Sequence, residues 1–129
     1  MRLVKPFTLV AASLLASVAF LGAAAAQDAT SCRVLTSWAG WGQDGTATFD
    51  VGAGRTCLLG ASTFGRFVSS KVAQQPQHGT VRQLSLSSWK YTPKPGFTGT
   101  DSFVISGTGH DPSQREAKHS QITLNVNVR

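Results

Sequence analysis

The stretch Gln121-Ile122-Thr123-Leu124-Asn125-Val126-Asn127-Val128 alternates apolar and polar residues without a break. Successive side chains of a β-strand point to opposite faces, so the apolar residues of this stretch share one face and the polar residues share the other. The pattern predicts a strand with one buried face and one face in water.

Short runs rich in Val, Thr, Phe and Ile recur upstream of this strand, and no window after Ala26 has the apolar spacing of a helix. The other predicted strands are Cys32 to Trp38, Thr46 to Val51, Thr56 to Gly60, Arg66 to Ala73, Gly79 to Leu84, Ser87 to Thr92 and Asp101 to Gly107. Turn signals separate them at Asp44-Gly45, Gly52 to Gly54, Pro76 to Gly79, Pro93 to Gly96 and Gly107 to Pro112. Seven or eight short strands at this spacing indicate an all-β, antiparallel sandwich with Greek-key connections, and a small barrel is the alternative.

The first 26 residues have the pattern of a secretory signal peptide. Arg2 and Lys5 precede an apolar run from Phe7 to Leu21, and the small residues Ala23 to Ala26 follow. We expect cleavage after Ala26, which makes 27–129 a single domain in the periplasm or outside the cell. The alternative, an uncleaved anchor, requires a longer apolar span and a basic flank. No later run is long enough to cross a membrane.

Composition and charge narrow the possible partners. The chain has 129 residues, of which 41% are hydrophobic, as expected for one globular unit. Removing the first 26 residues takes away two of the twelve Lys and Arg and none of the six acids, which leaves 103 residues with a charge of +4. The basic residues are scattered singly, so a nucleic-acid partner is not expected. We expect a monomer with a weak, salt-sensitive attraction to anionic surfaces.

The two cysteines are Cys32 and Cys57. In an oxidising compartment thiols pair, so we predict a disulfide between them. The alternative is a metal or redox pair, but neither cysteine lies in a C-x-x-C motif or near a histidine in the sequence.

Prolines, glycines and aromatic residues recur in a distinct pattern in the second half of the chain. Pro76-Gln77-His78-Gly79-Thr80 is followed by the stretch from Tyr91 to Ile105, which reads YTPKPGFTGTDSFVI, and by the alternating strand that ends at Val128. Turn chemistry accounts for these residues, because Asp101 can accept backbone N–H bonds where a strand begins. A catalytic role for Asp101 or His78 is therefore not needed to explain them.

This sequence pattern resembles that of the bacterial immunoglobulin-like and cadherin-like repeat. The usual pattern of that family is P-x-H-G-T followed by Y-x-P-x-x-G-F-x-G-x-D-x-F. The resemblance implies an immunoglobulin-like β-sandwich that is a non-catalytic, extracytoplasmic module. It is specific over the last half of the chain and looser from Thr46 to Leu59, while Gln27 to Gly45 is outside the usual pattern. The chain contains one copy and lacks the acidic clusters through which cadherin-like arrays hold calcium.

The sequence contains no motif that indicates a particular reaction. It has no nucleophile-elbow G-x-S-x-G, no phosphate-binding glycine loop before a helix, and few acids for a glycosidase pair. His110, Asp111 and His119 could meet across a hairpin and hold zinc, which would suit a small zinc-dependent hydrolase. We predict no cofactor and no catalytic residue, and we keep this hydrolase, or one of another type, as the alternative.

Tryptophans are the candidate binding residues. Trp38 and Trp41 lie in a glycine-containing turn, where exposed aromatics stack on sugars or fill a partner's pocket. Trp89 is the third tryptophan, and the alternative for all three is packing, as a tryptophan in the sandwich core and a lid over one open end. The sequence thus predicts a secreted or periplasmic module that binds an envelope protein or polysaccharide at Trp38 and Trp41. A structural part of an envelope assembly is a further alternative.

Overall fold

The computed structural model describes residues 30–129, and the expected signal peptide lies outside them. The described residues form strands β1 (Thr30–Ser31), β2 (Val34–Ser37), β3 (Gly45–Val51), β4 (Cys57–Gly60), β5 (Arg66–Gln74), β6 (Gly79–Ser85), β7 (Ser88–Pro93), β8 (Gly99–His110) and β9 (Lys118–Val128). Within this range, no helix is long and apolar enough to cross a membrane.

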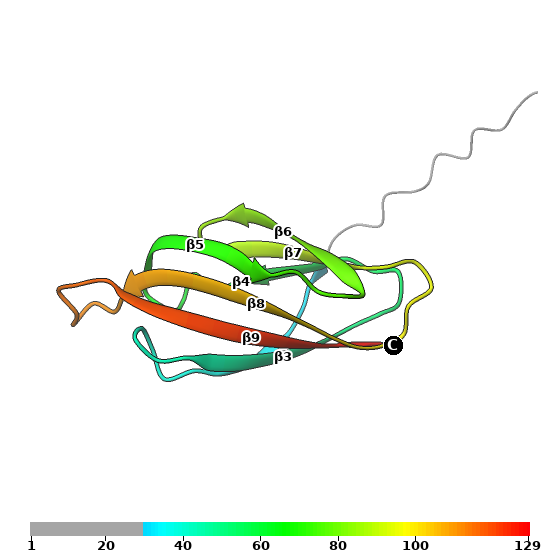
Figure 1. Ribbon diagram of the computed structural model, residues 1–129, viewed down its shortest axis with the longest axis horizontal. Coiled ribbons are helices and arrows are strands. Elements are labelled where there is room, and N and C mark those ends of the chain that lie inside the picture. The colour runs from blue at the N-terminus through cyan, green and yellow to red at the C-terminus, as the bar shows by residue number, and fades with distance from the viewer. Residues whose placement is uncertain (1–29) are drawn as a thin grey trace, which may run out of the picture.

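The strands form two sheets, which Figure 1 shows lying one over the other. One sheet has the order β1-β4-β7-β6, and the other has the order β2-β3-β9-β8-β5. Most neighbours are antiparallel, but β3 runs parallel to β9 and β1 runs parallel to β4. The fold is therefore the predicted all-β immunoglobulin-like sandwich, and the alternative of a barrel is wrong because the two sheets are separately paired.

The alternation read from the sequence sets the inner faces of the sheets. In β9, Leu124, Val126 and Val128 are buried while Asn125 is exposed, as predicted. Phe49 of β3 lies opposite Val126 in the same sheet. The largest fully buried side chains between the sheets are Tyr91, Phe49, Phe103, Val126 and Cys57. Burial of this apolar surface is the main term that favours folding.

The predicted strand from Cys32 to Trp38 is wrong at its start, because β2 begins only at Val34 and a separate strand, β1, precedes it at Thr30–Ser31. β1 pairs with β4, then Cys32 and Arg33 cross over, and β2 pairs with β3 in the other sheet. Alternation is a local property and does not reveal a change of sheet. As a result, the N-terminal segment adds an edge strand to each sheet.

The predicted turn from Gly107 to Pro112 is also wrong, because β8 continues to His110. Gly107 and Gly109 stand opposite Ser120 and Lys118 in the β8–β9 ladder. A Cβ at Gly109 would collide with the Trp41 indole and would lie 2.5 Å from the Arg66 carbonyl oxygen. These glycines therefore permit close packing within a strand rather than a turn.

Candidate functional site

Three loops meet at the end of the sandwich opposite the C-terminus (Figure 1). They are the β2–β3 loop with Trp38 and Trp41, the β4–β5 loop with Phe64, and the tip of the β8–β9 hairpin with Asp111. Residues from all three line one surface groove. This end of the molecule is the candidate binding site.

Trp41 belongs to the same loop as Trp38 but does not line the groove, and its side chain is only 4% exposed. Its Nε1 donates a hydrogen bond to the Phe64 carbonyl oxygen at 2.8 Å. Its ring packs edge-to-face against Trp38 at 5.2 Å and against Phe67 at 4.8 Å between centroids. These contacts match the lid that the sequence offered as the alternative, so Trp41 is poorly placed to stack directly on a ligand.

Trp38 is half-buried and lines the groove. Its Nε1 donates to the Gln43 carbonyl oxygen at 2.8 Å, and its ring meets Phe64 edge-to-face at 5.4 Å. The indole is thus held in one orientation before any ligand arrives. Trp89, the third tryptophan, is 3% exposed and belongs to the core. The binding role of Trp38 and Trp41 remains a prediction.

The groove has a volume of about 790 Å³ and combines aromatic and polar side chains. Arg66, His110 and Asp111 line it together with Trp38 and Phe64. The Asp111 backbone N–H donates to the Gln114 side-chain oxygen, and the Gln114 side-chain amide donates to the Trp41 carbonyl oxygen. These bonds tie the hairpin tip to the tryptophan loop. No sequence spacing had indicated Phe64 or Arg66, which only the fold brings here.

Below the groove, a cavity of about 290 Å³ lies between the two sheets. Five aromatic rings line it, namely those of Trp38, Trp41, Phe64, Phe67 and Trp89. Aliphatic side chains complete the wall: Val34 and Ala47, Leu59 and Ala61, and Ile105, Ile122 and Leu124. None of the lining residues is Asp, Glu, His, Lys or Arg. The cavity is therefore an apolar environment without formal charge.

The candidate zinc ligands do not form a site. His110 and Asp111 lie at the end of β8, and His119 pairs with Thr108 near the start of β9. Across residues 30–129, no group of three or more His, Cys, Asp and Glu side chains could hold a metal ion. The zinc-hydrolase alternative therefore lacks its metal centre in this part of the chain.

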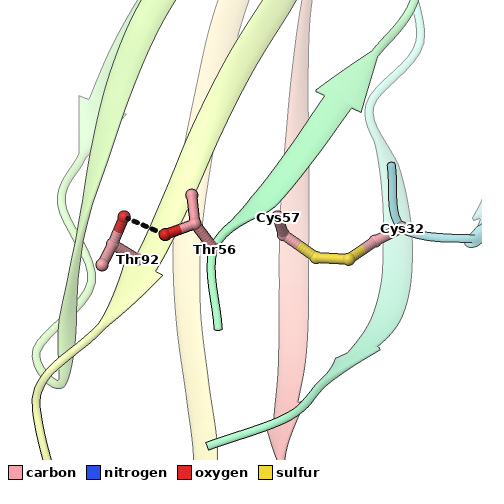
Figure 2. The surroundings of a disulfide bond; sticks show 4 residues. All are labelled: Cys32, Thr56, Cys57 and Thr92. Carbon is pink, nitrogen blue, oxygen red and sulfur yellow. Dashed lines mark hydrogen bonds between the residues drawn. A yellow bond between two sulfur atoms is a disulfide. The ribbon is translucent and has the colours of Figure 1, made fainter. Parts of the chain in front are cut away.

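The predicted disulfide between Cys32 and Cys57 is present, with Cα atoms 5.5 Å apart. Figure 2 shows it spanning the space between β4 and the N-terminal segment. Cys57 is fully buried, and Cys32 lies on the wall of the cavity. Close by, the hydroxyl groups of Thr56 and Thr92 are 3.3 Å apart and hydrogen-bonded. The bond therefore attaches the sheet-crossing segment to the core.

Asp101 and His78 have structural contacts. Asp101 is 6% exposed and accepts hydrogen bonds from the Tyr91 hydroxyl at 2.8 Å and from the backbone N–H groups of His78 and Ser102. The His78 ring stacks on Phe97 at 4.3 Å. Burial, and then the Asp101 carboxylate, raises the pKa of Tyr91 above its ordinary value of 10.0. Asp101 accepts backbone N–H bonds as predicted, but it does so from within β8 rather than from a turn.

These features define an immunoglobulin-like sandwich with an aromatic site at one end. The sequence model of the bacterial Ig domain matches residues 42–126, and the chain belongs to that family. Members of this family are generally non-catalytic modules. The match begins after Trp41, so β1, β2 and both candidate tryptophans lie outside it.

Individual proteins show little similarity to this chain. No curated protein has a matching sequence. A crystal structure of sialyltransferase from Photobacterium damsela is similar to 67% of this chain, with 16% sequence identity and a TM-score of 0.38. The chain spans 18% of the length of that protein.

Proposed function

We propose that this chain is an extracytoplasmic, non-catalytic module that binds an envelope polysaccharide in the groove at Trp38. The observation that carries the proposal is a half-buried, firmly held indole beside Arg66, His110 and Asp111 in one groove. Sugar rings have apolar faces and polar edges, so they suit an aromatic platform with hydrogen-bonding groups around it. Binding a pocket or helix of a partner protein would require a larger apolar surface on this domain.

The proposed location rests on two features of the chain. The first 26 residues have the sequence pattern of an export signal, and the disulfide is of the kind that persists in oxidising compartments. Family membership agrees with an extracytoplasmic module. We propose export to the periplasm or the outside of the cell, where envelope polysaccharides are available.

A sedimentation assay with purified, insoluble envelope polysaccharide tests the proposal. A negatively charged ion-exchange matrix serves as the comparison, because it retains the protein through exposed charges alone. Salt screens such charges beyond about 8 Å at physiological ionic strength. We expect moderate salt to release the protein from the matrix but to leave a fraction bound to the polysaccharide. Stacking on an indole is not screened by salt, so Trp38→Ala should remove that fraction.

The control is Leu35→Ala, which truncates an apolar side chain of β2 that is 63% exposed and lies outside the groove. This variant should bind as the unchanged protein does. Circular dichroism of both variants shows whether the sandwich is retained. Binding that moderate salt abolishes completely, or that persists in folded Trp38→Ala, would refute the proposed site. Retention on immobilised envelope proteins in place of polysaccharide would refute the proposed ligand class.

A further inference from the structure

The cavity between the sheets has a wall that the family fold does not supply. Cys32, Val34, Thr36, Trp38 and Trp41 line it from the N-terminal side, and all five precede the matched range 42–126. The opposite walls come from strands of both sheets. The added segment of this chain therefore encloses a space that the matched domain alone would leave without that wall.

The mouth of the cavity can be located from exposure. Most lining residues are buried or half-buried, but Thr36 of β2 and Gly60 and Thr63 at the end of β4 and beyond are exposed. The opening therefore lies between β2 and the β4–β5 loop. A small molecule could enter there without separating the sheets.

One residue of the wall has a polar group without a partner. Trp89 is 3% exposed, and among the described residues its Nε1 has no hydrogen-bond acceptor. Two other polar groups of wall residues have partners: the Trp41 Nε1 donates to the Phe64 carbonyl oxygen, and the Ser120 hydroxyl accepts from the Gly42 backbone N–H at 3.0 Å. Buried donors without an acceptor are uncommon in proteins, and each one calls for an explanation.

Size and charge restrict what could satisfy this donor. A dry apolar cavity of about 150 Å³ admits benzene, so about 290 Å³ has room for on the order of a dozen non-hydrogen atoms. Because no charged side chain lines the wall, an ion would lose its hydration without compensation. A water molecule would meet few polar partners in such a space.

We propose that this cavity is a binding site for a small, neutral, largely apolar carbonyl compound whose oxygen accepts the hydrogen bond of Trp89 Nε1. The aromatic rings of the wall contact the apolar body of the ligand, and the indole N–H orients its oxygen. The cavity shares Trp38, Thr63 and Phe64 with the polysaccharide groove, but Trp89 and Ala61 line the cavity and not the groove.

The test uses two probes of similar shape, acetophenone and isopropylbenzene, of which only the first has an acceptor. The chain has three tryptophans, so nitrogen-15 spectra of the protein contain few indole N–H signals. We expect both probes to bind, with acetophenone about three to ten times tighter, because a net hydrogen bond contributes roughly that factor. The Trp89 indole signal should shift strongly with acetophenone and weakly with isopropylbenzene.

Two variants separate the cavity from other sites. Ala61→Phe, which places a ring in the cavity from its wall, should abolish binding of both probes. Trp89→Phe removes the donor but keeps an aromatic ring, so it should bind isopropylbenzene and lose the preference for acetophenone. A Trp89 indole signal that does not shift when acetophenone is added would overturn the proposal. Unchanged binding of the probes in folded Ala61→Phe would overturn it as well. Should Ala61→Phe fail to fold, an acetophenone preference retained in Trp89→Phe would overturn it instead. Polysaccharide binding is tested separately through Trp38→Ala, because neither Ala61 nor Trp89 lines the groove.

Discussion

Removing the disulfide should destabilise the protein without destroying its fold. The cysteines are 25 residues apart, so the bond closes a loop of 26 residues counted inclusively. In the chain-entropy model, closing a loop of that length contributes about 3.5 kcal/mol at 25 °C, by restricting the unfolded chain. A domain of about a hundred residues has roughly 5 to 15 kcal/mol of stability, so the sandwich should survive the loss.

The suitable variant is Cys32→Ala, because Cys57 is fully buried and its truncation would add a packing defect. The remaining Cys57 thiol should behave as a small buried apolar group. We expect the urea midpoint to fall by about 1 to 3 M, and the slope of the transition to increase because the unfolded chain becomes more extended. Ser31→Ala, which removes an exposed neighbouring hydroxyl, is the control and should leave the midpoint unchanged.

Two results would contradict this reasoning. A loss below about 1 kcal/mol would mean that restriction of the unfolded chain is not the main contribution of the bond. Disappearance of the β-sheet signal would mean that the sandwich depends on the N-terminal segment for its core. Thiol counting on the denatured, unreduced protein provides the starting point, since it should find no free thiol.

Three further predictions concern the core. Tyr91 is the one tyrosine of the chain, and its pKa is raised in the folded protein. The stability that this shift contributes is present below pH 10 and is lost as the pH rises further. Tyrosinate absorbance should therefore appear together with alkaline unfolding and not before it. Asp101→Ala should reduce stability by about 1 to 3 kcal/mol, because it leaves the buried Tyr91 hydroxyl without its acceptor, and combining it with Tyr91→Phe should recover part of the loss in a urea titration. Gly109→Ala should reduce the free energy of unfolding by about 1 to 3 kcal/mol through overpacking against Trp41, which a lower melting temperature would reveal. Gly60→Ala, whose Cβ would have no neighbour within 4 Å, should be close to neutral, and equal effects of the two variants would contradict the packing argument.

Local patterns were sufficient to predict most of the strands. The alternation from Ile122 to Val128 corresponds to β9, and the predicted strand from Thr46 to Val51 differs from β3 by one residue. Period-two alternation survives in the sequence because each strand of a half-buried sheet must present one apolar face. The disulfide could also be predicted, since it follows from two cysteines and an export signal rather than from the details of the fold.

The candidate site required the tertiary structure. Trp38 and Trp41 are three residues apart, yet one is half-buried on the groove and the other is 4% exposed beneath it. Their difference depends on Phe64 of the β4–β5 loop, which packs against Trp38, and on Phe67 of β5, which packs against Trp41. Side-chain burial of this kind is decided by long-range neighbours, which periodicity does not report.

By itself, the sequence determined the all-β class, most of the strands and the family pattern, because each rests on residue types within a few positions of one another. It also determined the disulfide, because the chain has only two cysteines to pair. The tertiary structure decided that β1 and β2 belong to different sheets, that His110, Asp111 and His119 form no metal centre, and that Trp89 lines a cavity. These properties depend on which distant segments pack together, and packing depends on the summed burial of the whole chain rather than on any local pattern.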